Sequence, residues 1–254
     1  MARNNAADFT GPGLRLRQVG AARLRWMALF LLLLVAIALG GIWYGQTLTE
    51  PHPERFASGV RTSGAAWEAA QREPGVRAYL EGFQTQEHWS SCGPASLRNV
   101  LNSLSMPVKR ERELFGDETG AWLRMWLTGM TLDEVAALAK AADVGRVRVW
   151  RDFSESAFRE LLESLDSPQR RLIANFDREP LHGVSLGHFS PIAGYDPASD
   201  RVALLDVTPG FGIQLVPVDK LYEAINTMDP MSGRSRGLIV IDADIESGET
   251  ATTR

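Results

Sequence analysis

The single cysteine of this chain, Cys92, lies in the run Ser90-Ser-Cys-Gly-Pro94, directly before an amphipathic helical pattern. A helix start presents unpaired backbone N–H groups and the positive end of the helix dipole, and both favour a thiolate over a thiol. Farther along the chain, His188 and Asp206 each lie in an apolar run typical of a strand. Cysteine, histidine and carboxylate are the components of a thiol acyl-transfer site, so this set predicts nucleophilic catalysis.

Four histidines compete for the role of general base. His188 is favoured because its segment has the pattern of a half-buried strand, and Asp206 on the next strand could fix its tautomer and support an imidazolium. His52 falls in an irregular segment, whereas His88 and His182 fall in loops where a solvated or structural histidine is more common. The alternative interpretation of Asp206 is a turn former at the end of a strand.

Gln86 precedes Cys92 in a stretch of turn-tolerant residues. Its side-chain amide could curl back and donate a hydrogen bond to an oxyanion. Ser90 or Ser91 could cap the helix and leave further N–H groups near the sulfur. The alternatives are a small buried hydrophobe for Cys92 and a surface polar residue for Gln86.

Composition and motifs exclude several classes of function. The formal net charge of −4 gives no reason to expect a nucleic-acid partner. One cysteine and four scattered histidines lack the spacings of a zinc site, and no glycine-rich phosphate cradle is present in the sequence. We therefore expect no metal site, and the chemistry requires no cofactor.

An uncharged, mostly apolar segment runs from Trp26 to Thr49. Its most apolar part, Met27–Tyr44, would rise about 27 Å as a helix, close to the roughly 30 Å hydrocarbon core of a bilayer. Aromatic residues stand at both ends of this part, as interfacial anchors do. The sequence therefore predicts a transmembrane signal anchor over residues 26–47.

The charges that flank this segment predict its orientation. Upstream, one acid, Asp8, is outnumbered by the arginines at positions 3, 15, 17, 23 and 25. This excess makes residues 1–25 a cytoplasmic basic tail and places the rest of the chain in the periplasm, outside a cytoplasmic (inner) membrane. The alternative is a cleaved signal peptide with Ala36-Ile-Ala38 as its cleavage site, but the apolar run continues past that site to Tyr44.

The remaining chain divides into a linker at 48–75, a folded body at 76–243 and a disordered tail at 244–254. Apolar spacing predicts helices after Cys92, after the capping box Thr131-Leu-Asp-Glu134 and after Ser154. The second half alternates between strands and one helix. We expect the helix at 219–228 and strands at 171–176, 188–195, 201–207, 215–218 and 237–241. Helices followed by an antiparallel sheet make an α+β fold.

Three segments resemble the phytochelatin synthase family. The run Gln86-Glu-His-Trp-Ser-Ser-Cys-Gly-Pro-Ala-Ser-Leu97 is similar to that family's nucleophile segment, and Gly187-His-Phe-Ser-Pro-Ile-Ala-Gly-Tyr-Asp196 resembles its histidine segment almost residue for residue. Leu204-Leu-Asp-Val207 is similar to its aspartate strand. The first of these runs is also similar to the start of double-glycine leader peptidases. The resemblance covers about residues 78–241 and indicates a bacterial, single-domain member.

The resemblance implies a papain-like cysteine peptidase fold and an enzyme that breaks the Cys–Gly bond of glutathione. By motif position, Cys92 forms a γ-glutamylcysteinyl thioester, His188 is the general acid/base, Asp206 orients it and Gln86 is the oxyanion donor. Glutathione or a related γ-glutamyl peptide is then the partner. The heavy-metal thiolate of glutathione could also serve as substrate.

The sequence departs from the family pattern after Asp206, where Val207-Thr-Pro-Gly-Phe-Gly-Ile213 replaces an arginine-containing run. A buried carboxylate needs a charged partner, so the missing cation favours water over a second glutathione as acyl acceptor. No cysteine-rich C-terminal extension is present in this sequence, so we expect no metal sensing by thiolates within it. The alternatives are a peptidase acting on a larger exported peptide and a catalytically silent peptide-binding domain.

Overall fold

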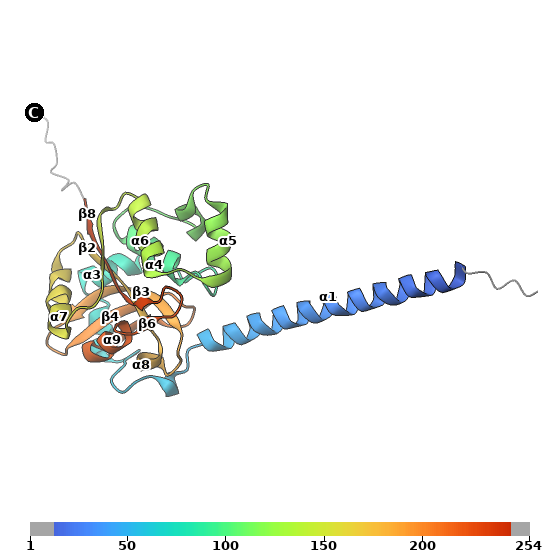
Figure 1. Ribbon diagram of the computed structural model, residues 1–254. Helices are drawn as coiled ribbons and strands as arrows, with labels where there is room; N and C mark the ends of the chain where they lie inside the picture. Colours follow the sequence, from blue (N-terminus) through green and yellow to red (C-terminus); the bar gives the residue numbers. More distant parts are fainter. Residues whose placement is uncertain (1–12, 245–254) are drawn as a thin grey trace, which may run out of the picture. The chain divides into compact units, whose positions relative to one another are not determined.

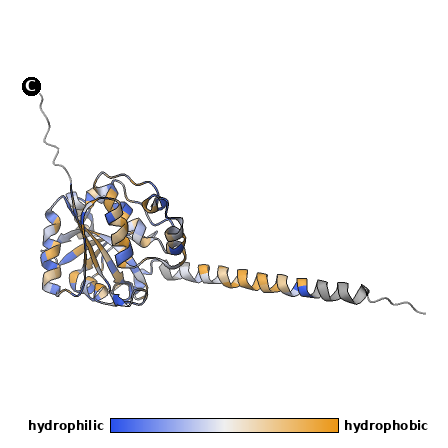
Figure 2. Cartoon of the chain, turned by 45° about the horizontal axis from the view of Figure 1, so that its top comes forward, coloured by the Kyte–Doolittle hydropathy of each residue, from blue (hydrophilic) through white to orange (hydrophobic). Residues whose placement is uncertain are grey.

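The computed structural model describes residues 13–244, which fall into two units divided after Thr47. The described part of the first unit is helix α1 (Gly13–Thr49), which runs on into the first residues of the second. Arg23–Gly45 in this helix is long and apolar enough to cross a membrane, with a mean hydropathy of 2.4, and Figure 2 shows much of this helix in the orange of hydrophobic residues. The helix extends past both ends of the predicted anchor. Residues 1–12 of the predicted tail lie outside the described residues.

The second unit is built on a six-stranded antiparallel sheet in the order β1-β8-β2-β3-β4-β5 (Figure 1). Helices cover both of its faces. The strands are β1 (Gly145–Trp150), β2 (Arg170–Asp177), β3 (Gly187–Asp196), β4 (Arg201–Asp206), β5 (Gly212–Pro217) and β8 (Gly237–Ala243). The short strands β6 (Met228–Asp229) and β7 (Arg234–Ser235) form a separate hairpin.

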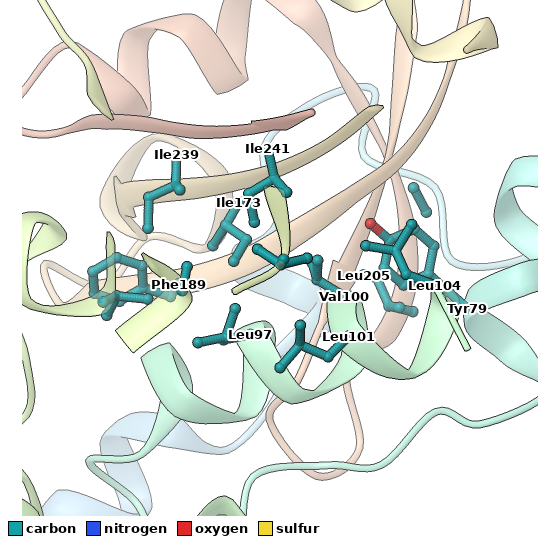
Figure 3. Close-up of a cluster of buried hydrophobic side chains, with 14 of the residues drawn as sticks. Tyr79, Leu97, Val100, Leu101, Leu104, Ile173, Phe189, Leu205, Ile239 and Ile241 are labelled. Carbon is teal, nitrogen blue, oxygen red and sulfur yellow. The ribbon is translucent and has the colours of Figure 1, made fainter. Parts of the chain in front are cut away.

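One face of the sheet packs against α4 (Cys92–Ser103) and α6 (Leu132–Ala141). The buried apolar side of α4 is the predicted one, and it includes Leu97, Val100 and Leu101. Figure 3 shows these side chains facing Ile173 and other residues of the central strands. Burying such side chains contributes about 1.5–3 kcal/mol each, and this packing fixes the start of α4 against the sheet.

The opposite face packs against α7 (Glu155–Glu163) and α9 (Val218–Ile225). Leu172 and Ala174 point to this face while Ile173 points to the other, as the two-residue period of a strand requires. Because both faces of the sheet are covered, the central strands consist of continuous apolar runs. The α+β prediction is confirmed, and each predicted strand occurs within a few residues of its expected bounds.

The local helix signals had two outcomes. The capping box at the start of α6 is present, with the Thr131 hydroxyl accepting from the Glu134 N–H and the Glu134 carboxylate accepting from the Thr131 N–H. Ser154 caps α7 by accepting from Ala157 N at 3.2 Å. The expected serine cap of α4 is not formed, because the hydroxyl of its N-cap residue, Ser91, is engaged with the main chain of His88.

Several elements were not anticipated. The segment at 48–75, predicted as a linker, contains regular structure and pairs with the sheet at Arg61 and Leu215. Strand β1 and the β6–β7 hairpin were also missed. The remaining helices are η1 (Pro53–Arg55), α2 (Ala65–Ala70), α3 (Pro74–Leu80), η2 (Glu111–Phe115), α5 (Thr119–Thr128), η3 (Ser164–Asp166) and α8 (Glu179–His182). From the predicted C-terminal tail, only Asp244 is among the described residues.

Candidate active site

Cys92 is the first residue of α4, so its sulfur lies at the positive end of a 12-residue helix. Gly93 allows this helix start to approach the sheet closely. A Cβ atom at Gly93 would lie 2.6 Å from Cγ2 of Val135 and 3.6 Å from Cδ2 of Phe189. Any larger side chain after the cysteine would therefore clash with Val135 and push α4 away from α6.

His188 and Asp206 lie on neighbouring antiparallel strands, near the start of β3 and at the end of β4. His188 Nε2 and Asp206 Oδ1 are 2.9 Å apart, and both side chains are buried. The backbone N–H of Phe189, the residue after His188, lies close enough to the Cys92 thiol to lower its pKa. The structure therefore pairs His188 with Asp206 and places the start of β3 beside the cysteine, and Asp206 does not occupy imidazole Nδ1.

Asp206 is held by a fully buried arginine, Arg178. Arg178 Nη2 donates to Asp206 Oδ1 at 2.9 Å, to Oδ2 at 2.7 Å and to Thr208 Oγ1 at 2.6 Å. The Thr208 N–H also donates to Oδ1, at 2.9 Å. These contacts keep Asp206 ionised and fixed, because a buried carboxylate is stable only when it is paired and hydrogen-bonded.

Sequence reasoning missed Arg178. The expected cation after Asp206 is indeed absent from that loop, but the turn between β2 and α8 supplies one from elsewhere in the chain. A usable signal was present, since Arg178 lies two residues after the predicted strand at 171–176. Arg178 is committed to Asp206, so it does not serve as a free cation for a second anionic substrate.

Burial sets the protonation of this group. It raises the pKa of the Cys92 thiol to about 11, although the N–H groups of Phe189 and Gly93 and the charge of Arg178 oppose it. Burial, with Arg178, also lowers the pKa of His188 to about 4, against the effect of Asp206. The Asp206 pKa is held well below its usual range by Arg178 and His188, despite burial. Burial thus opposes the thiolate that the helix start was expected to favour, and it also opposes the charged form of His188.

Gln86 lies in the loop that leads into α4, and it is buried. Its backbone N–H donates to the Val207 carbonyl at 2.7 Å, which joins this loop to the end of β4 next to Asp206. The side-chain amide curls back, as predicted, and Nε2 donates to the Trp89 carbonyl at 3.2 Å. The second N–H of this amide remains available for a developing oxyanion.

The loop that carries Gln86 is fastened to α4 by two side chains of that helix. Asn99 exchanges two hydrogen bonds with the main chain of Gln84, at 2.9 and 2.8 Å. Buried Arg98 donates to the Thr85 carbonyl and to the Glu87 carboxylate, both at 2.8 Å. Helix α4 therefore positions both the nucleophile and the loop with the predicted oxyanion donor.

The other histidines occupy different environments. His182 is buried, and its Nε2 lies 2.7 Å from the neutral amide oxygen of Gln214. The half-buried His88 stacks on Trp126 with a ring separation of 4.3 Å. His52 contacts the exposed Glu54 carboxylate at 3.1 Å. Of the four histidines, His188 is the one hydrogen-bonded to a carboxylate in the buried interior.

A second buried arginine, Arg236, borders the site. Its Nη1 donates to Asn175 Oδ1 at 3.1 Å, and its Nε has no partner among residues 13–244. A Cβ atom on Gly187 would lie 2.7 Å from Arg236 Nη1. This glycine immediately precedes His188 in β3, so a buried cation lies next to the predicted base. Sequence reasoning did not single out Arg236 as a site residue.

Within residues 13–244, no group of three or more His, Cys, Asp or Glu side chains is arranged to hold a metal ion.

The chain is similar to known proteins over this same region. Residues 64–238 match the family model for phytochelatin synthase. The chain is 32% identical over 177 residues to glutathione gamma-glutamylcysteinyltransferase 3 of Lotus japonicus, which covers 63% of this chain and 36% of that protein. It is also 32% identical over 212 residues to glutathione gamma-glutamylcysteinyltransferase 1 of Triticum aestivum, which covers 78% of this chain and 42% of that protein.

The chain thus spans less than half the length of these relatives. Among solved structures, the peptidase domain of Streptococcus ComA is 15% identical with a TM-score of 0.43, over 63% of this chain and 96% of that domain. The family match extends from α2 to β8 and includes all four predicted site residues. The chain belongs to the phytochelatin synthase family.

Proposed function

We propose that this protein cleaves the Cys–Gly bond of glutathione through a γ-glutamylcysteinyl thioester on Cys92. The single observation that carries the proposal is the buried His188–Asp206 pair beside the cysteine at the start of α4. The names of the relatives, glutathione gamma-glutamylcysteinyltransferases, support glutathione as substrate. The chain covers less than half of these relatives, so the proposal depends on the residues of the site.

In the first step, the Cys92 thiol attacks the cysteinyl carbonyl of glutathione while His188 takes the thiol proton. Burial raises the pKa of the thiol and lowers that of the imidazole, so we place the proton transfer together with the attack. Asp206, through its bond to Nε2, stabilises the imidazolium and leaves Nδ1 to take the thiol proton. The Gln86 amide and the helix-start N–H groups stabilise the oxyanion.

In the second step, His188 returns the proton to the leaving nitrogen, and glycine departs. Water then attacks the thioester, or a second glutathione accepts the acyl group. We favour water: Arg178 is occupied by Asp206, and Arg236, which also lies 3.9 Å from the Asp177 carboxylate, is the buried cation beside the base's strand that could bind one substrate carboxylate. Arg236 lies beside Gly187, which precedes the proposed base His188 in β3. We therefore assign the α-carboxylate of the γ-glutamyl group to Arg236.

The localisation that we propose is a cytoplasmic membrane, with the catalytic unit on the periplasmic side. Helix α1 is long and apolar enough to span the membrane, and the arginine excess before it favours a cytoplasmic N-terminus. The two acyl transfers need no cofactor, since glutathione supplies the acyl group. A heavy-metal thiolate of glutathione would enter as substrate.

The proposal is tested with the full chain in detergent, incubated with glutathione with and without cadmium. Mass spectrometry should detect γ-glutamylcysteine and free glycine, and peptides of two or more γ-glutamylcysteine units would identify glutathione as acceptor. The Cys92→Ser variant should release no glycine while keeping the same melting temperature. Glycine release by that variant at the wild-type rate would rule out the thioester mechanism.

A further inference from the structure

The exposed large apolar side chains of the second unit gather on one surface. Outside α1, these exposed side chains among the described residues are Trp89, Leu123, Trp126, Leu127, Met228 and Met231, and we call them the apolar rim. Leu127 is 66% exposed and Leu123 is 55% exposed. A cluster of this kind marks an interaction surface, because soluble surfaces normally scatter such residues singly.

Contacts show that the apolar rim is continuous. Leu123, Trp126 and Leu127 share one face of α5 at the i, i+3, i+4 spacing. The loop with Trp89 joins that helix where Ser90 Oγ donates to the Trp126 carbonyl at 2.9 Å. The hairpin adjoins both, since a Cβ atom on Gly129 would lie 3.7 Å from the Ser90 carbonyl and 3.9 Å from Met231 Cε.

Two arginines beside the apolar rim are paired with carboxylates. Arg124, the one charged residue of α5, contacts the Glu134 carboxylate at 2.6 Å. In the hairpin, Arg234 contacts Asp133 at 2.9 Å. Tryptophan, leucine and methionine with neutralised charges suit the boundary between lipid headgroups and acyl chains.

The link between the two units is short, so a bilayer spanned by α1 would lie within reach of the second unit. The membrane-length segment ends at Gly45, and the packing of the second unit begins at Pro51, whose Cγ would lie 3.2 Å from a Cβ on Gly210. The intervening residues can extend no more than about 20 Å. Pro51 contacts the loop that follows Val207, and Val207 accepts from the N–H of Gln86, in the same loop as Trp89. The attachment point and the apolar rim therefore flank the same catalytic region.

We propose that the apolar rim lies against the lipid bilayer that α1 spans, so that the catalytic unit docks on the membrane by a fixed face. The proposal rests on the membrane anchor of the proposed function, but not on the glutathione chemistry. It assigns a role to exposed side chains that the acyl-transfer mechanism does not use.

The test places one fluorescent label on the full chain in nanodiscs that contain nitroxide-bearing lipids. Cys92→Ser removes the native thiol, and Leu127→Cys then gives a label on the apolar rim. The matched control is Glu160→Cys on α7, which Figure 1 shows on the side of the second unit away from α5. With one copy per nanodisc, the label at 127 should lose most of its fluorescence to the nitroxide lipids, and the label at 160 almost none.

Equal quenching at the two positions would overturn the proposal, because the unit would then have no preferred face. Little quenching of the label at 127 with one copy per nanodisc would also overturn it, because the apolar rim would then not lie against the lipid. Glycine release by the wild-type chain is measured separately. A failure of membrane docking is thus distinguished from a failure of the proposed chemistry.

Discussion

Two buried histidines lie near one end of the same sheet, and their surroundings differ in one decisive respect. His188 is hydrogen-bonded to a carboxylate that Arg178 keeps ionised, and it adjoins the strand residue whose backbone N–H lies close to the nucleophile's thiol. His182 is bonded to the neutral amide of Gln214. An imidazole can accept a proton in a buried site only if a fixed anion compensates the new charge. Burial alone therefore does not make a catalytic histidine; the charge of its partner does.

The largest effect is expected when His188 itself is replaced. His188→Ala should lower the rate of glycine release by at least about 10³-fold, because the thiol then has no proton acceptor. The rate is measured with saturating glutathione, and circular dichroism checks that the fold is kept. A variant that retains most of its activity would mean that another residue is the base.

The partner charge is tested by Asp206→Asn. We expect a loss of about 10²- to 10⁴-fold in kcat, because the neutral amide neither stabilises the imidazolium nor fixes the productive tautomer. Removing one member of a buried ion pair should also cost about 3–5 kcal/mol of folding stability, since Arg178 is left unpaired. Chemical denaturation measures that cost. An unchanged kcat together with a lower stability would reduce Asp206 to a structural residue.

The protonation of the pair predicts how Cys92 reacts with iodoacetamide. With its pKa raised to about 11 by burial, the thiol should react slowly at pH 6, and its rate should rise about tenfold per pH unit toward that value. Because Cys92 is the single cysteine, mass spectrometry of the whole chain reports this thiol alone. Fast alkylation at pH 6 would instead indicate a resting thiolate–imidazolium pair.

The smallest effect is expected at the second histidine. His182→Gln should change kcat by no more than about threefold, because the neutral Gln214 amide beside His182 cannot stabilise an imidazolium. Its stability should fall by about 1–3 kcal/mol through the loss of a buried hydrogen bond. A collapse of activity in a folded His182→Gln protein would mean that the neutral pair contributes to catalysis.

Local patterns in the sequence were enough to predict most elements of the second unit. The capping box at Thr131, the apolar face that contains Leu97 and the continuous apolar runs of the central strands are short-range signals, and the structure has each of them. Strand β1 was missed although Val147 and Val149 alternate with arginines, a pattern that marks an edge strand. Helix α5 was missed because Leu123 and Leu127 are exposed, which obscures the usual amphipathic stripe.

The sequence alone determined the family resemblance, the membrane-length segment and the identities of Cys92, His188, Asp206 and Gln86, since each of these lies in a contiguous motif. Only the tertiary structure decided that Arg178 is the charge partner of Asp206, 28 residues away in sequence. It likewise decided the protonation of Cys92, which depends on how much water the packed chain excludes. A motif consists of residues that are close together in the sequence, whereas charge pairing and desolvation depend on which distant segments the fold brings together.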